Sequence, residues 1–124
     1  MIIGIGIDIV QINRMHQWLE NKKLMERYFH NDEISLVLSR GNNAIQTLAV
    51  RFAAKEALGK ALGTGLANIT LKDIMVVNDK NGKPEIKLFG TAQKALEIYG
   101  VNRVHVSLSH EKENAVAMIV LEGL

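Results

Sequence analysis

Hydrophobic and polar side chains alternate at the start of the chain, which predicts a strand over residues 2–10. The isoleucines at odd-numbered positions fall on one face of that strand, whereas two glycines, Asp8 and Val10 fall on the other. Glycine inside a strand often marks a place where a ligand or another backbone comes close. We therefore expect something to pack tightly against the glycine-bearing face.

The stretch that follows predicts short helices separated by polar breaks. Asn13 is expected to cap a helix over residues 15–19, and further helical turns are expected over residues 24–29. Asp32 is expected to cap a short helix over residues 34–38. A glycine followed by two asparagines then breaks the helical pattern.

One long helix is predicted from residue 44 to residue 62. Its apolar side chains are mostly three or four positions apart, as one buried helix face requires. Gly63 is suited to end this helix, because glycine adopts the left-handed conformation found at many helix ends. Gly65 is not explained by capping, so it favours a backbone that passes close to a ligand.

The remainder of the chain predicts two pairs of strands around one helix. These elements are a strand over 73–78, a strand over 84–89, a helix over 91–99, a strand over 103–109 and a strand over 115–121. Asn81-Gly82 is a strong hairpin signal between the first two strands. The order predicts an α+β fold in which one long helix packs on a mainly antiparallel sheet.

Composition narrows the class of protein. The chain has 124 residues and 48% hydrophobic content, which fit one globular domain spanning residues 1–124. It has no cysteine, so disulfide and thiolate chemistry are excluded and a reducing cytoplasm is compatible. No apolar run approaches the length of a membrane span. A net charge of +2 and only three phenylalanines argue against a nucleic-acid binder. The mild positive charge is compatible with acidic protein partners or phosphorylated ligands.

Asp8 lies in apolar surroundings near the end of the first strand. A carboxylate in such surroundings needs a cation or hydrogen-bond donors. Two roles fit: a metal ligand at the end of the strand, or a cap for the turn that follows. The segment is not a dinucleotide-binding fingerprint, since Ile9 stands where the third glycine would be.

The segment from Arg51 to Gly65 places Glu56 among cations. Arg51 and Lys55 are four residues apart, as are Glu56 and Lys60, so each pair shares a helix face. A carboxylate among cations, followed by a flexible glycine loop, is suited to holding a metal ion and phosphates. The alternative is an ordinary solvent-exposed ion pair between Glu56 and Lys60.

The strand near the C-terminus has one polar face, formed by His105, Ser107 and Ser109. That face could bind a polar group, or it could simply be solvated. His110 ends the strand, where it could reach a phosphate. No Gly-x-Ser-x-Gly elbow is present, and the four histidines lack zinc-type spacing, so neither a hydrolytic triad nor a zinc site is indicated.

Three motifs follow one another along the chain: Gly4-Ile-Gly-Ile-Asp8-Ile-Val, Arg51-Phe-Ala-Ala-Lys-Glu56 continuing to Lys60-Ala-Leu-Gly-Thr-Gly65, and Ser107-Leu-Ser-His110. Together they closely resemble the short bacterial holo-[acyl-carrier-protein] synthases, which are 4′-phosphopantetheinyl transferases. The resemblance covers nearly the full length and is poorest over about residues 15–45. It implies the 4′-phosphopantetheinyl transferase fold.

The resemblance implies a group transfer that supports fatty acid biosynthesis. The phosphopantetheine arm of coenzyme A moves to a serine of apo acyl carrier protein, and adenosine 3′,5′-bisphosphate is released. In this family magnesium is held by the aspartate of the first motif and the glutamate of the second, which are Asp8 and Glu56 here. Lys60 is expected to stabilise the departing bisphosphate, and Glu56 to take the serine proton directly or through a water.

The resemblance also implies contacts with coenzyme A and with the carrier. Expected to line the coenzyme site are Arg51, Lys55, Gly63, Gly65, Lys83, Pro84, Ser109 and His110. Expected to dock the acidic carrier are Arg14, Met15, Trp18, Lys22, Lys23 and Arg27. Short members of the family resemble homotrimers with sites between subunits, so some of these residues are expected to serve a neighbouring subunit.

Two other classes of function remain open. A non-catalytic module that binds coenzyme A or a nucleotide could keep the same fold, although the presence of Asp8, Glu56 and Lys60 argues against lost activity. A small basic nucleic-acid binder is disfavoured by the few aromatic side chains and the localised carboxylates.

Overall fold

The structure is a computed structural model that describes residues 1–124. Its elements follow the chain in the order β1 (Ile2–Gln11), η1 (Ile12–Met15), α1 (His16–Leu19), α2 (Lys22–Tyr28), α3 (Asn31–Ser39), η2 (Gly41–Asn43), α4 (Ala44–Leu62), η3 (Leu71–Asp73), β2 (Ile74–Asn78), β3 (Pro84–Leu88), α5 (Gly90–Ile98), β4 (Val101–His110) and β5 (Asn114–Gly123). The predicted α+β class is confirmed, and every strand pair is antiparallel. None of the helices is long and apolar enough to cross a lipid bilayer.

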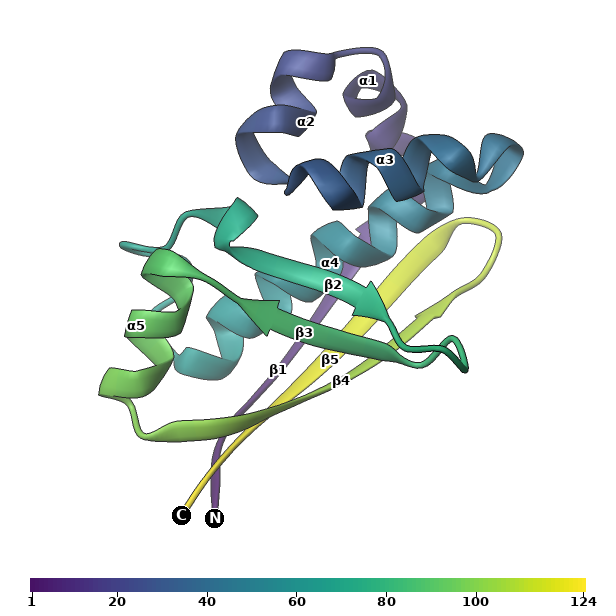
Figure 1. The fold of residues 1–124 in the computed structure, drawn as a ribbon. Coiled ribbons are helices and arrows are strands. Elements are labelled where there is room, and N and C mark those ends of the chain that lie inside the picture. Colours follow the sequence, from purple (N-terminus) through teal and green to yellow (C-terminus); the bar gives the residue numbers. More distant parts are fainter.

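Three strands form the larger sheet, in the order β1-β5-β4. In its register, Ile7 of β1 and Ser107 of β4 both lie opposite Met118 of β5. The alternate residues Ala117 and Ile119 of β5 belong to the buried core. Helix α4 lies across this side of the sheet (Figure 1), so the long helix packs on the sheet as predicted.

Gly4 and Gly6 allow α4 to lie directly on β1. A Cβ atom at Gly4 would overlap the carbonyl oxygen of Ala61, and one at Gly6 would overlap that of Ala57. Both obstacles are backbone atoms of α4, so a larger side chain would have to push the helix away. The close neighbour expected on this face of β1 is therefore a helix backbone and not a ligand.

Strands β2 and β3 form a separate two-stranded sheet, in which Asn78 lies opposite Pro84 at the turn. The turn is the one that Asn81-Gly82 predicts, and Gly82 has the left-handed backbone (φ +85°) that glycine adopts readily. β2 contacts α3 and α4, and β3 contacts β4. The hairpin thus crosses in front of the long helix and the larger sheet (Figure 1).

Two of the predicted helix caps are wrong. Asn13 lies inside η1, and the residue before α1 is Met15. Helix α3 is capped by His30, whose Nδ1 accepts from the backbone N–H of Asp32 at 3.1 Å. Glu33 completes this cap, because its Oε1 accepts from the backbone N–H of His30 at 3.0 Å. Asp32 therefore lies within the first turn of the helix that it was expected to cap.

No element of the chain covers the second face of the three-stranded sheet. Ile5, Ile7 and Ile9 of β1 are 60%, 59% and 63% exposed, and Met118 of β5 is 41% exposed. The register places Met118 beside Ile7, so these side chains form one apolar surface. Exposed apolar surfaces of this kind are typical of sites where a protein, a membrane or a ligand binds.

Candidate functional site

Asp8 and Lys60 pair where β1 meets α4. Lys60 Nζ lies 2.9 Å from Asp8 Oδ1 and donates a second hydrogen bond to the carbonyl oxygen of Ile7, at 3.1 Å. The Asp8 side chain is 15% exposed and that of Lys60 is 56% exposed, so the pair lies at the edge of the core. Asp8 accepts from Lys60 and not from the backbone of the turn after β1, so the alternative of a cap is not observed.

Glu56 lies near this pair and is half-buried. Burial raises the pKa of its carboxyl group, the charge of Asp8 raises it further, and Lys60 opposes both effects. A carboxylate in such surroundings gains more than an exposed one from binding a proton or a cation. The alternative of an ordinary Glu56–Lys60 ion pair is not observed, because Lys60 pairs with Asp8 instead.

The two carboxylates fit magnesium by the chemistry of their donor atoms. Magnesium in proteins is held by one or two carboxylates, and waters and substrate phosphates complete its coordination. No group of three histidine, cysteine or acidic side chains that could hold a metal occurs in the structure, so a closed zinc site has no ligands here. A divalent cation shared by Asp8 and Glu56 would also relieve the repulsion that raises the pKa of Glu56.

Gly63 and Gly65 close the C-terminal end of α4. Gly63 has φ +82°, and its N–H donates to the carbonyl oxygen of Lys60 at 3.0 Å. Gly65 has φ +65°, and its N–H donates to the carbonyl oxygen of Gly59 at 3.0 Å. Gly65 therefore does help to cap the helix, contrary to the expectation from sequence. No atom lies within 4 Å of a Cβ built on either left-handed glycine, so open space remains beside the loop.

A cavity of about 250 Å³ lies between α4, the β2–β3 turn and the end of β4. Arg51, Pro84 and His110, three of the predicted coenzyme contacts, line it together. They are far apart in the sequence, so the fold brings them to one place. Asn78 and Gln46 also line the cavity and were not predicted.

Arg51 is the buried cation of this cavity, at 4% exposure. Its Nη2 donates to Asn78 Oδ1 at 2.9 Å, and its Nη1 donates to the carbonyl oxygen of Thr47 at 3.3 Å. Burial lowers the pKa of Arg51, although the charge of Glu33 raises it in part. Two buried atoms have no hydrogen-bond partner, Arg51 Nε and Gln46 Oε1. Both atoms belong to residues that line the cavity, and neither has a partner within the chain.

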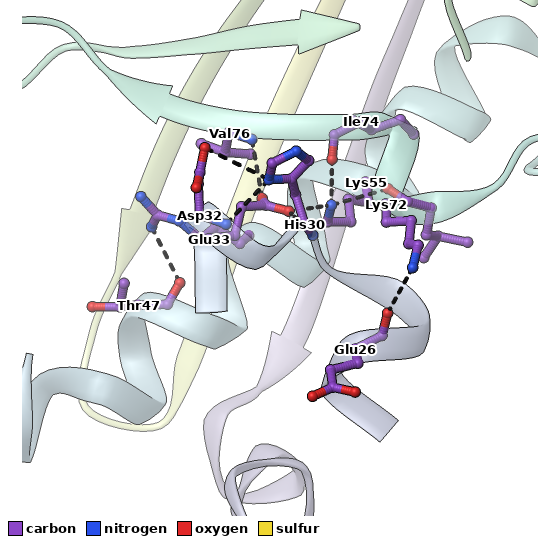
Figure 2. A network of polar contacts seen from close by, with 11 residues as sticks. Glu26, His30, Asp32, Glu33, Thr47, Lys55, Lys72, Ile74 and Val76 are labelled. Carbon is purple, nitrogen blue, oxygen red and sulfur yellow. Dashed lines mark hydrogen bonds and ion pairs between the residues drawn. The ribbon is translucent and has the colours of Figure 1, made fainter. Parts of the chain in front are cut away.

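Lys55 reaches neither the Asp8 pair nor the cavity, so the prediction that it contacts a phosphate is wrong. Its side chain is 0% exposed, and its Nζ lies 2.7 Å from Glu33 Oε1. It also donates to the carbonyl oxygens of Leu71, at 3.0 Å, and Ile74. Figure 2 shows these contacts inside the junction of α3, α4 and β2. Burial lowers the pKa of Lys55, and Glu33 opposes that shift.

Ser109 and Lys83 lie outside the Arg51 cavity. Ser109 points to the opposite face of β4 from His110, with His105 and Ser107, and this exposed polar face is the one that alternation predicts. Lys83 lines a neighbouring hollow of about 330 Å³ between β3 and β4, which Pro84 also lines. Their proposed contacts with coenzyme A therefore need a ligand that extends beyond the cavity.

The family model described as the 4′-phosphopantetheinyl transferase superfamily matches residues 4–119. The chain belongs to this superfamily. The holo-[acyl-carrier-protein] synthase of Treponema denticola is 57% identical over 123 residues, which cover 99% of this chain and 100% of that protein. The synthase of Clostridium tetani is 45% identical over 124 residues, covering 99% and 98%. The predicted family is confirmed.

Solved structures of phosphopantetheinyl transferases share the fold. A holo-(acyl-carrier-protein) synthase from Bacillus anthracis, in complex with CoA (3′,5′-ADP), is 40% identical with a TM-score of 0.83 and covers 100% of this chain and 99% of its own. The synthase from Neisseria meningitidis is 35% identical with a TM-score of 0.89, covering 98% and 99%. The predicted transferase fold is thus confirmed.

In this member of the transferase superfamily, the residues around Asp8 and the residues of the Arg51 cavity lie on different faces of α4. Arg51 and Lys60 are nine positions apart, about two and a half helical turns, so their side chains point in opposite directions. Glu56 shares the face of Lys60, toward β1, whereas Arg51 points toward β2. The helix therefore separates the carboxylates from the Arg51 cavity.

Of the residues predicted to dock the carrier, Met15 cannot serve as a surface anchor. It is buried at 1% exposure in the core. Trp18 is partly buried in an aromatic cluster, with its ring centroid 5.4 Å from that of Tyr28 and 5.2 Å from that of Phe52. The four predicted cations are all exposed, and they are Arg14, Lys22, Lys23 and Arg27. The basic part of the predicted surface is available, and its apolar part is mostly structural.

Proposed function

We propose that this chain transfers the 4′-phosphopantetheine arm of coenzyme A to a serine hydroxyl of apo acyl carrier protein and releases adenosine 3′,5′-bisphosphate. The observation that carries the proposal is that the fold gathers Asp8, Glu56 and Lys60 at one place. Relatives named for this reaction match the whole chain. The reaction supplies carriers for fatty acid biosynthesis, and we place it in the cytoplasm, which the lack of cysteine suits.

The chain's residues have separate tasks in this transfer. A bond forms between the serine oxygen and the β-phosphorus of coenzyme A, and the bond from that phosphorus to the bridging oxygen breaks, so the electron pair leaves with the bisphosphate. Glu56 is the proposed general base and accepts the serine proton, directly or through a water. Lys60 uses two N–H groups on Asp8 and Ile7, and its third can donate to the leaving phosphate.

Magnesium dependence is part of the proposal, with Asp8 and Glu56 as the ligands. Asp8 and Glu56 would hold the ion, and its charge would offset the negative charge that builds up during transfer. The protein's own contribution is to hold two carboxylates close together, and Lys60 keeps Asp8 in place through its hydrogen bond.

The Arg51 cavity is the proposed site for the adenosine bisphosphate end of coenzyme A. Its buried guanidinium suits a phosphate, and Pro84 and His110 add an apolar and a basic wall. Gly63, Gly65 and Lys83 remain candidates along the path of the coenzyme outside the cavity.

A homotrimer with sites between subunits explains how one coenzyme meets both groups of residues. Arg51 and Lys60 of one chain point away from each other, so a ligand between two subunits can contact Lys60 of one and Arg51 of the next. The uncovered sheet face with Ile5, Ile7 and Ile9 supports association. The resemblance to the short synthases is the reason to propose three subunits. Ser109 lies on this face and could join a site only across the subunit boundary.

The decisive experiment measures the intact mass of an apo acyl carrier protein after incubation with the chain, coenzyme A and magnesium. The carrier should gain the mass of one phosphopantetheine group, and a carrier with its acceptor serine replaced by alanine should gain none. Omitting magnesium, with a chelator present, should prevent the gain. Binding of coenzyme A without any change in carrier mass would reject the transferase and leave the non-catalytic binding module.

The exposed cations near α1 and α2 are the proposed dock for the acidic carrier. Reversing one charge in Arg14→Glu should raise the KM for the carrier about tenfold and leave the KM for coenzyme A unchanged, because charge complementarity acts on encounter with the carrier alone. Lys94→Glu on α5 makes the same change at another exposed site and is the control. Equal KM values for the carrier in the two variants would place the dock elsewhere.

A further inference from the structure

Glu33 of α3 and Lys55 of α4 form an ion pair that is closed to solvent. Both side chains are 0% exposed, and Lys55 Nζ lies 2.7 Å from Glu33 Oε1. The ring of Phe29 covers the ammonium group, with its centroid 4.9 Å away. No step of the proposed reaction uses either charged side chain, so their presence in the core needs another explanation.

The pair supplies hydrogen-bond partners to backbone groups on the free edge of β2. This strand pairs with β3 on one side only. On its other side, Lys55 donates to the carbonyl oxygen of Ile74, and Glu33 Oε2 accepts from the N–H of Val76 at 3.0 Å. The two side chains thus bond to β2 as the backbone of another strand would. They hold β2 against α3 and α4 with contacts of fixed direction (Figure 2).

The same two elements, α4 and β2, form the Arg51 cavity one turn further along. Arg51 precedes Lys55 by four residues and shares its helix face. Asn78 follows Val76 by two residues on β2 and accepts from Arg51 Nη2 at 2.9 Å. The separation of α4 and β2 at Lys55 therefore sets their separation at Arg51.

Stability alone does not account for a buried ion pair at this junction. Apolar side chains of similar size are often as stable in such a place or more so. They would lack directed contacts, whereas Lys55 uses all three N–H groups and both oxygens of Glu33 accept hydrogen bonds. What the pair adds is a single relative placement of α4 and β2.

We propose that Glu33 and Lys55 are positioning residues for the coenzyme pocket: by docking β2 on α4, they hold the Arg51 guanidinium where it receives a phosphate of the coenzyme. This inference rests on the proposed function, because it takes the cavity as the coenzyme site. Neither residue of the pair touches the ligand. Three cations, Arg40, Arg51 and Lys55, lie near two carboxylates, Glu33 and Asp73, so the local charge also favours an anion in the cavity.

Calorimetric titration with coenzyme A measures this role directly. In Glu33→Gln protein the dissociation constant for coenzyme A is expected to rise about tenfold, through the displaced guanidinium. The KM for coenzyme A should rise in step. The kcat at saturation and the KM for the carrier should stay within about twofold, because Glu33 bonds to neither Asp8, Glu56 nor Lys60.

A destabilised control separates positioning from a general loss of stability. Leu96→Ala removes a side chain with 2% exposure in α5, away from the contact between α4 and β2. Both variants are titrated at temperatures where their folded fractions match. A larger dissociation constant in Glu33→Gln than in Leu96→Ala supports the positioning role, and equal constants overturn it.

A second variant covers the case in which Glu33→Gln does not fold, because that change leaves the buried Lys55 without a counter-charge. Glu33→Gln/Lys55→Met removes both charges together. Weak binding of coenzyme A by the folded double variant supports the proposal, and wild-type affinity overturns it. Transfer to the carrier is assayed on wild-type protein in parallel. Its absence would reject the proposed function, while the calorimetric comparison would still decide the role of the pair.

Discussion

Glu56 is a side chain whose surroundings favour its neutral form. Burial and the charge of Asp8 raise the pKa of its carboxyl group above 4.5, its ordinary value. The folded chain therefore binds this proton more tightly than the unfolded chain does. The resulting stability is fully present below the ordinary pKa and is lost as the pH rises through the folded pKa. At neutral pH, without a metal, the charged Glu56 weakens the fold.

Glu56→Gln should consequently stabilise the metal-free protein at neutral pH while it removes activity. We expect a gain of less than about 1 kcal/mol after solvent screening, shrinking toward zero as the pH falls to the ordinary glutamate pKa. The transfer rate should fall about a hundredfold or more, because the carboxylate is both base and metal ligand in the proposal. Urea unfolding in EDTA at several pH values measures the first effect. Lower stability of the variant at neutral pH would contradict this account of Glu56.

At the scale of elements, the contact between β1 and α4 determines whether Asp8 meets Lys60. The two glycines of β1 lie against the carbonyl oxygens of Ala57 and Ala61, one helical turn apart. Helix and strand can therefore approach closely over the length that carries the site. The distance of 2.9 Å between Lys60 Nζ and Asp8 Oδ1 depends on this approach.

Gly6→Ala should separate β1 from α4, because the new methyl group would meet the carbonyl oxygen of Ala57. We expect a loss of about 1–3 kcal/mol in the free energy of unfolding, as for other overpacked cores, and lower activity in the fraction that remains folded. Gly82→Asn is the control, since it replaces a left-handed glycine with open space around it and asparagine tolerates that backbone. Equal urea midpoints for the two variants would show that the close approach is not needed.

Local patterns predicted the elements well and the environment of single side chains less well. The bounds of α4, the Asn81-Gly82 turn and the alternation of β4 follow from spacing within a few residues. The burial of Lys55 and Met15 does not, because it depends on α3 and other elements that cover them. Glu33 stands three residues after the cap of α3, a spacing typical of a capping box. Its bond to Lys55, however, joins residues 22 positions apart. Asn78 likewise reaches Arg51 from 27 positions away.

At the scale of the whole molecule, the uncovered sheet face is the surface through which we propose that copies of the chain associate. The apolar half of this face lies on β1 and β5, and the polar half lies on β4, where His105 pairs with Glu122 at 2.9 Å. A single chain leaves all of these side chains in water. Association of several chains would bury the apolar half and leave polar groups at the margin.

Ile5→Lys tests this association, because it places a charge in the centre of the apolar face, where Ile5 is 60% exposed in a single chain. We expect dissociation to smaller species in light scattering, with association weakened by about 2 kcal/mol or more, and loss of transfer activity. Leu38→Lys is the matched control, since Leu38 lies on α3 and is 54% exposed. An oligomer of unchanged size in the Ile5 variant would exclude this face as the interface.

Because Arg51 and Lys60 point away from each other on α4, two defective chains can restore one another. In a shared site, the Arg51→Ala chain still supplies an intact carboxylate face, and the Glu56→Gln chain still supplies an intact cavity. Each variant is expected to be inactive when expressed alone. Coexpression in equal amounts would assemble roughly a quarter of all sites from two intact halves, given a cyclic arrangement with random mixing. Genetic complementation between two null alleles would thus report a catalytic centre that no single polypeptide contains.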